Sequence, residues 1–306
     1  MLALRVILDT DIGTDVDDLY ALAFLLASPE LDLCGVTVVH GDVNLRASIV
    51  LKLLDAAGIT NIPLALGARD PMQFGVQAYW TGQEGHGLDL EPPDPSRLDP
   101  RPAVSFILER IGEAPGRTGL ITIGPLTNAG LLARDHPDAF RALQAVSIMG
   151  GNYHPPGARP VTPEHNFRCD PEAAWRVLTL APQCRLVGLN ITQRTSLTRD
   201  LLKELESLGT PAGALLARAG AHYLQQTGRD ATPMHDSVAV AAYFRSELFR
   251  WERLVPAVQT TGDGAGVVTF RREDGEGHSI QVAVDADIPA FQNLFRERIL
   301  SFAARA

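Results

Sequence analysis

VILDTDIGTDVDDLYALAFLLA, residues 6–27, joins a short apolar run to a longer helical pattern through an acidic turn. The run Val6–Leu8 is typical of a buried strand, and Asp17–Ala27 predicts an amphipathic helix. Five carboxylates fall within ten residues of this segment, at Asp9, Asp11, Asp15, Asp17 and Asp18. A strand that leads directly into a helix is the first half of a βαβ unit, so the segment favours an α/β fold.

The alternation of strand and helix continues along the chain. Further strands are expected at Gly35–Val39, Pro63–Leu66, Gly119–Ile123, Ala145–Met149 and Arg185–Leu189. Further helices are expected at Asn44–Ala57, Ala103–Ile111, Asn128–Arg134 and Pro171–Leu180. This order predicts an open, mostly parallel sheet with helices on both faces.

The pattern changes after Ile191. Helices dominate as far as Phe244, and strands follow near Val255–Thr260, Gly266–Arg271 and Ser279–Val284, before a last helix at Ile288–Ala303. The glycine-rich turn at 262–266 predicts a hairpin that makes the sheet mixed at one edge. No linker, repeat or low-complexity segment divides the chain, so residues 1–306 are expected to form one domain.

The composition excludes several classes of protein. Residues of the hydrophobic set make up 45% of the chain and charged residues 21%, as in ordinary globular proteins. The formal net charge of −9 argues against a nucleic acid polymer as partner. Three cysteines without a CxxC pair favour a reducing cytoplasm. The longest apolar stretch, Leu19–Ala27, is too short to span a membrane, and the N-terminus has no signal-peptide pattern.

Polar motifs follow the ends of several expected strands. DTDIGTDVDD (9–18) follows the first strand, HGDVN (40–44) the second, IGPLTN (123–128) the strand at 119–123 and MGGNYH (149–154) the strand at 145–149. Ligands of parallel sheets bind beyond the carboxyl ends of the strands. These distant segments are therefore expected to meet at one rim.

The aspartates of residues 9–18 favour a hard cation. Carboxylates this close repel one another unless a cation neutralises them, and oxygen ligands without nearby cysteine or histidine suit calcium or magnesium. A helix cap at Asp17 or Asp18 is the structural alternative, but it leaves the other aspartates unexplained. An EF-hand would need Gly and Glu at the positions held by Thr14 and Tyr20. A magnesium-dependent phosphatase of the haloacid dehalogenase type, with Asp9 or Asp11 as nucleophile, stays open, although Gly13 departs from its pattern.

Two further segments carry candidate groups. PMHDSVAVAAY places His235 and Asp236 at the start of a helix, where such a pair is more often structural than functional. PEHNFRCDP, residues 163–171, places Glu164 and Asn166 in a loop before a helix. Neither segment alone indicates a reaction.

Together, DTDIGTDVDD, VTVVHGD, IGPLTN, IMGGNYH, EHNFRCDPEAA and MHDSVAV resemble the inosine–uridine nucleoside hydrolase family in order and spacing. The resemblance covers nearly the whole chain. It implies a Rossmann-like nucleoside hydrolase fold, a bound Ca²⁺ ion, a small-molecule nucleoside substrate and a homo-oligomer, either a dimer or a tetramer.

The resemblance also assigns residues by position. It implies Asp11, Asp18, Asp236 and the carbonyl of Ile123 as calcium ligands, with Asp11 as general base and His235 as the acid for the leaving base. The ribose contacts that it implies are Asp17, Asp42, Glu164 and Asn166, and the base contacts are Trp80, His165 and Tyr223. The role of Asp15 is left open.

The reaction implied is cleavage of the N-glycosidic bond of a ribonucleoside into free base and ribose. Positive charge develops on the ribose in such a reaction, and carboxylates around the sugar stabilise it most in the transition state. A lapsed relative that binds calcium and nucleoside without turnover is the alternative of another class.

Overall fold

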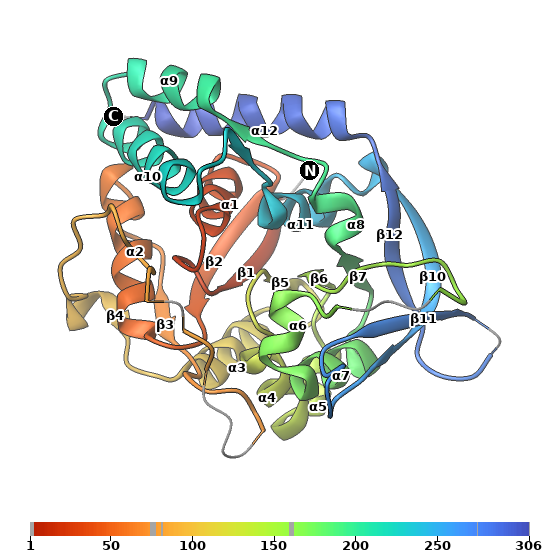
Figure 1. Ribbon diagram of the computed structural model, residues 1–306. Coiled ribbons are helices and arrows are strands. Elements are labelled where there is room, and N and C mark those ends of the chain that lie inside the picture. Colours follow the sequence, from red (N-terminus) through yellow and green to blue (C-terminus); the bar gives the residue numbers. More distant parts are fainter. Residues whose placement is uncertain (1–2, 74–77, 81, 159–161, 274, 306) are drawn as a thin grey trace.

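One twisted sheet forms the centre of the computed structural model, which describes residues 3–73, 78–80, 82–158, 162–273 and 275–305 (Figure 1). Its strands are β1 (Leu4–Thr10), β2 (Leu31–Val38), β3 (Leu64–Leu66), β4 (Leu98–Asp99), β5 (Thr118–Thr122), β6 (Val146–Met149), β7 (Cys184–Val187), β10 (Phe249–Val258), β11 (Val268–Arg272) and β12 (Ile280–Ala286). Their order is β11-β10-β12-β7-β6-β5-β1-β2-β3-β4.

The sheet is parallel except at one edge. Strands β1 to β7 of this sheet and β12 run in the same direction, whereas β10 pairs antiparallel with both β12 and β11. The predicted mixed edge is therefore confirmed, and the hairpin that produces it lies between β10 and β11.

Helices cover both faces of the sheet (Figure 1). The longer ones are α1 (Asp17–Leu26), α2 (Val43–Ala56), α3 (Ala103–Glu113), α4 (Thr127–Asp135), α7 (Pro171–Leu180), α9 (Arg199–Ser207), α10 (Pro211–Thr227), α11 (His235–Phe244) and α12 (Ile288–Ala303). Three short helices, α5 (Pro137–Arg141), α6 (His165–Cys169) and α8 (Leu189–Thr192), lie in the connections.

The alternation of side chains along β1 divides the core in two. Val6 and Leu8 belong to the buried cluster formed with α1, α2, α10, α11 and α12. Ile7, which points to the opposite face, belongs to the cluster formed with α3, α4 and α7. Successive strand residues face opposite sides, so a fully apolar strand is the expected sequence for a position buried on both faces.

A second, two-stranded sheet was not predicted. Strands β8 (Leu197–Thr198) and β9 (Ala231–Thr232) pair antiparallel. Strand β8 lies directly before α9, and β9 lies shortly before α11. Next to this pair, the backbone N–H of Met234 donates to Thr195 Oγ1 over 2.9 Å. These contacts fix the chain just before α11, where His235 begins the helix.

The position of β1 in the strand order creates a crevice. The chain continues from β1 to β2 on one side, while β5 flanks β1 on the other. Connections on the two sides of β1 therefore diverge at its carboxyl end, which is where open α/β sheets bind ligands. Within the described ranges, all three cysteines are free and no helix is long and apolar enough to cross a bilayer.

Asp170 ties three segments together below this crevice. Its fully buried carboxylate accepts hydrogen bonds from Thr127 Oγ1 (2.7 Å) and from the backbone N–H groups of Met72 (2.8 Å) and Ala173 (3.0 Å). Asp170→Ala would leave these buried donors without an acceptor. We expect it to lower the free energy of unfolding by about 3 kcal/mol, measured by urea denaturation.

The matched control for Asp170 is Asp138→Ala. The Asp138 side chain is almost fully exposed and pairs only with Arg141 along the surface of α5. Surface pairs of this kind contribute little to stability, so the control is expected to unfold within about 0.5 kcal/mol of the parent protein. Equal losses in the two variants would contradict the anchoring role of Asp170.

Candidate functional site

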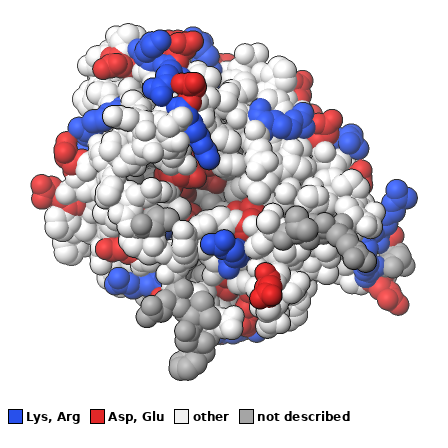
Figure 2. All heavy atoms as spheres, in the orientation of Figure 1, with Lys and Arg blue, Asp and Glu red and all other residues white. Residues whose placement is uncertain are grey.

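A cleft of about 350 Å³ opens at the carboxyl end of the central strands. Figure 2 shows acidic atoms at the bottom of a hollow in this face of the molecule. The cleft is lined by residues from many segments: Asp11, Thr14, Asp15, Asp17, Asp18, Tyr79, Gln83, Ile123, Met149, Pro163, Glu164, His165, Asn166, Leu189, Tyr223, His235 and Asp236. Among these lining residues there is no lysine or arginine.

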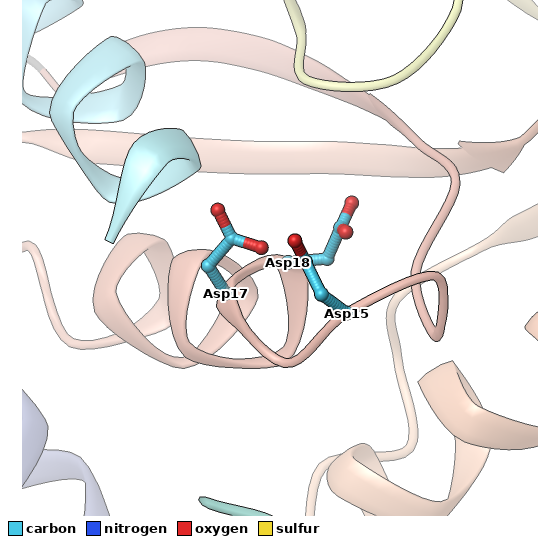
Figure 3. Close-up of side chains that lie close together, drawn as sticks. All are labelled: Asp15, Asp17 and Asp18. Carbon is cyan, nitrogen blue, oxygen red and sulfur yellow. The ribbon is translucent and has the colours of Figure 1, made fainter. Parts of the chain in front are cut away.

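Three aspartates at the start of α1 lie closest together. Asp15 belongs to the turn after β1, and Asp17 and Asp18 form the first turn of α1 (Figure 3). One carboxylate oxygen from each can be chosen so that all three lie within 4.8 Å of one another. No side chain caps α1, whose N-cap position is Val16, so the helix-cap alternative does not account for these carboxylates.

Burial and mutual repulsion make the charges of this cluster costly. Burial raises the pKa of Asp17 well above its usual range, and the charges of Asp15 and Asp18 raise it further. The pKa of Asp18 is raised by burial and by Asp11 and Asp15. The possible metal ligands here are carboxylate oxygens whose negative charges repel one another. A hard divalent cation such as calcium would neutralise them.

Asp236, more than 200 residues later in the sequence, lies beside this cluster. It lies buried in the first turn of α11, and its backbone N–H donates to Asp17 Oδ2 over 3.4 Å. Burial raises the pKa of Asp236, and the charges of Asp17 and Asp18 add to the rise. The pair of helix starts, α1 and α11, therefore brings together carboxylates that are far apart in sequence.

Asp11 is held between two loops. Thr14 Oγ1 lies 3.0 Å from Asp11 Oδ2, and His165 Nε2 lies 3.9 Å from the same oxygen. A Cβ added at Gly124 would lie 2.6 Å from Asp11 Oδ1, so only glycine leaves room for this carboxylate. Oδ1 therefore faces the loop that follows β5, next to Ile123.

Asn166 and Glu164 complete the opposite wall. Asn166 Nδ2 donates to the carbonyl oxygen of Ile123 (2.9 Å) and to that of Met149 (3.2 Å). Glu164 is the N-cap of α6 and accepts from the N–H groups of Asn166 (2.8 Å) and Gly151 (2.9 Å). Burial raises the pKa of Glu164. Both side chains line the cleft.

His235 faces the same cleft from the start of α11. Its Nδ1 lies 2.7 Å from Thr192 Oγ1, so one ring nitrogen is engaged behind the cleft. Burial lowers the pKa of His235, which favours the neutral ring. His165 and Tyr223, two of the predicted base contacts, also line the cleft.

Two predicted substrate contacts lie elsewhere. Asp42 is the N-cap of α2, where its Oδ1 accepts from the N–H groups of Asn44 and Leu45. The guanidinium carbon of Arg46 lies over the Trp80 ring, 5.1 Å from the ring centre. The same ring covers Gly41. Neither residue is among those that line the cleft: Asp42 caps α2 and Trp80 packs on Arg46. Their substrate contacts stay predictions.

Sequence reasoning missed part of the lining. Tyr79, Gln83, Met149 and Leu189 all line the cleft, and Thr14 contacts Asp11. Thr14 and Met149 lie in motifs that follow expected strands, but nothing in those motifs marked these two side chains. Tyr79, Gln83 and Leu189 carry no pattern, because their course to the cleft depends on the tertiary structure. Asp15, left open by the sequence, lies within the carboxylate cluster.

Comparisons with known proteins agree with this geometry. The family described as "Inosine-uridine preferring nucleoside hydrolase" matches residues 6–293. The non-specific ribonucleoside hydrolase RihC of Salmonella agona (strain SL483) is 34% identical over 308 residues, which cover 96% of this chain and 97% of that protein.

Two solved structures share the whole fold. A plant nucleoside hydrolase, the PpNRh1 enzyme, superposes with a TM-score of 0.86 at 27% identity and covers 98% of this chain and 99% of its own. The purine-preferring ribonucleoside hydrolase from Gardnerella vaginalis superposes with a TM-score of 0.87 at 26% identity, covering 99% and 100%. This chain therefore belongs to the inosine-uridine preferring nucleoside hydrolase family, whose members are hydrolases acting on N-glycosyl compounds.

Proposed function

We propose that this chain is a calcium-dependent hydrolase that cleaves the N-glycosidic bond of ribonucleosides to free base and ribose. The observation that carries the proposal is the cleft at the end of β1, which buried carboxylates from widely separated parts of the sequence line together. Such an environment favours a substrate on which positive charge develops during the reaction.

The cation would be held by carboxylates and one carbonyl. Asp11, Asp18, Asp236 and the carbonyl of Ile123 provide hard oxygen donors around the cleft, which suits calcium. When bound, the ion neutralises the carboxylates and orients the attacking water and the ribose hydroxyls.

The residues of the chain perform the remaining work. Asp11 accepts a proton from the attacking water as general base. Asp17, Glu164 and Asn166 accept or donate hydrogen bonds at the ribose hydroxyls and hold the sugar against the carboxylates. His235 donates a hydrogen bond or a proton to the departing base, and His165 and Tyr223 line the space for that base.

A panel of nucleosides tests the proposal. We expect release of ribose from inosine, uridine or a related nucleoside in a reducing-sugar assay, and loss of this activity when a chelator removes divalent ions. No ribose release across a panel of purine and pyrimidine nucleosides, together with phosphate release from an aryl phosphate, would instead support the phosphatase alternative. Binding of nucleoside by calorimetry without ribose release would support a non-catalytic relative.

Nucleotides provide a sharper comparison. The described residues that line the cleft include many carboxylates and no lysine or arginine, so a 5′-phosphate would bring like charge into it. Placing like charges together costs several kcal/mol, so kcat/KM for inosine 5′-monophosphate is expected to be at least about 100-fold below that for inosine. Equal kcat/KM values for the two compounds would contradict this account of the cleft.

A further inference from the structure

Arg46 on α2 is the largest fully buried side chain of the described residues. It is a full positive charge in the interior, yet its described hydrogen bonds go to no carboxylate, although its charge also acts on the nearby Asp18. Its donors go instead to neutral oxygens. Buried charges are normally paired with an opposite charge, so the acceptors of Arg46 indicate what this buried charge does.

The acceptors of Arg46 surround the acidic turn. Nε donates to the carbonyl of His40 over 2.6 Å, and Nη1 donates to the carbonyls of Asp11 and Ile12. His40 has a φ of 72°, a backbone conformation that is unfavourable for a residue with a Cβ. The Trp80 ring covers the guanidinium at 5.1 Å. The guanidinium is thus fixed on several sides beneath the cleft.

The remaining donor determines the direction of a hydrogen bond in the cleft. Arg46 Nη2 lies 3.1 Å from Thr14 Oγ1, and a guanidinium can only donate. Thr14 Oγ1 is therefore the acceptor in this contact, and its single proton is left for another group. Asp11 Oδ2, at 3.0 Å, is nearer than the Asp11 carbonyl oxygen, at 3.3 Å.

Because the Thr14 hydroxyl donates to Asp11, the two carboxylate oxygens of Asp11 have different surroundings. Oδ2 receives the Thr14 hydroxyl proton, whereas Oδ1 faces Gly124, where no side chain can be added without a clash. A carboxylate with one oxygen held in this way cannot rotate freely about its χ2 angle. Holding Oδ2 therefore also fixes the direction in which Oδ1 points.

We propose that Arg46 and Thr14 are positioning residues that form a relay to Asp11, Arg46 Nη2 to Thr14 Oγ1 to Asp11 Oδ2, and that this relay sets the orientation of the reactive carboxylate. The inference rests on the proposed role of Asp11 in nucleoside hydrolysis. Arg46 reaches the carboxylate of Asp11 through Thr14, in addition to its bond to the backbone carbonyl of Asp11, and the hydroxyl of Thr14 acts by orienting Asp11 without touching the reacting atoms.

Thr14→Val provides the main test, because valine keeps the shape of threonine and removes only the hydroxyl. We expect kcat for inosine to fall by about 10- to 100-fold at saturating calcium, as for other groups that orient a ligand, while KM changes by less than about threefold. Thr14→Ser retains a hydroxyl and is expected to keep kcat within about threefold of the parent enzyme.

A double-mutant cycle tests the relay itself. If Arg46 acts through the Thr14 hydroxyl, Arg46→Met lowers kcat, and adding Thr14→Val to it lowers kcat little further. Multiplication of the two effects would overturn the relay. Should Arg46→Met fail to fold, the comparison of Thr14→Val with Thr14→Ser still decides, because both leave the buried guanidinium in place.

Calcium titration without nucleoside gives a readout that does not depend on turnover. Thr14→Val is expected to bind calcium about tenfold more weakly than Thr14→Ser, because the carboxylate of Asp11 is no longer held in one orientation. Equal kcat values or equal calcium affinities for these two variants would overturn the proposal. A parent enzyme that releases no ribose from any nucleoside would instead refute the proposed function, so the two failures are distinguishable.

Discussion

Asp11→Asn is expected to lower kcat for ribonucleoside hydrolysis by about 10³-fold or more, since a general base alone contributes 10²- to 10⁴-fold. The amide cannot accept the proton from water, and the substitution also removes one charge from the proposed cation ligands. Because asparagine is nearly isosteric with aspartate, the new side chain fits the space beside Gly124 that the carboxylate oxygen Oδ1 occupies. Initial rates of ribose release at saturating calcium measure the effect.

Asp138→Asn is the control for this substitution. The carboxylate of Asp138 is exposed on α5 and is not part of the cleft lining. The substitution is therefore expected to leave kcat unchanged. The far-UV circular dichroism of both variants establishes that each is folded. Full ribose release by the Asp11 variant would show that another group accepts the proton, and would contradict the proposed mechanism.

Asp236→Asn is expected to have opposite effects on stability with and without calcium. Without the ion, the buried carboxylate is repelled by Asp17 and Asp18, so removing its charge should raise the melting temperature. With calcium at about 100 times its dissociation constant, the parent protein gains about 2.7 kcal/mol from the bound ion, a shift on the order of 5 °C. The variant lacks one ligand and should gain much less.

Thermal denaturation of both proteins, each with chelator and with calcium, measures these opposite changes in the melting temperature. Asp138→Asn again serves as control and is expected to follow the parent protein in both conditions, because its exposed side chain lies outside the cluster. A parent protein whose melting temperature is the same with chelator and with calcium would show that Asp236 is not part of a cation site.

Much of the fold could be predicted because it depends on local patterns. Helix α7 begins after the cap residue Asp170, which accepts from Ala173 N–H, and the helix covers Pro171–Leu180 as predicted. Helix α12 likewise covers Ile288–Ala303. Strands β8 and β9 could not be predicted, because each has two residues and therefore no periodicity.

The cleft was partly predictable for a different reason. The carboxyl ends of β1, β5 and β6 meet because the sheet is parallel, so motifs that follow these strands converge whatever their side chains contact. The sequence does not show what each polar group binds. Asp42 could equally cap a helix or reach a substrate, and the structure has it as a cap of α2.

Contacts between buried polar groups that are far apart in the sequence could not be predicted from it. Arg46 lies in a helix that is otherwise mostly apolar on its buried side, and nothing local indicates that its guanidinium reaches Thr14, 32 residues earlier. The signal that could have been used is the occurrence of a single arginine on the face of α2 that packs into the core.

The bond between Asp236 N–H and Asp17 spans 219 residues of sequence. An arrangement of this kind forms only after the entropy of closing a very long loop has been overcome. All the aspartates of the first turn leave the ribosome early, but they acquire their partner only when α11 has been synthesised and docked. The proposed cation site, which includes Asp236, would therefore form only after α11 is present: a nascent chain that ends before α11 would carry the aspartates of residues 9–18 and still lack this ligand.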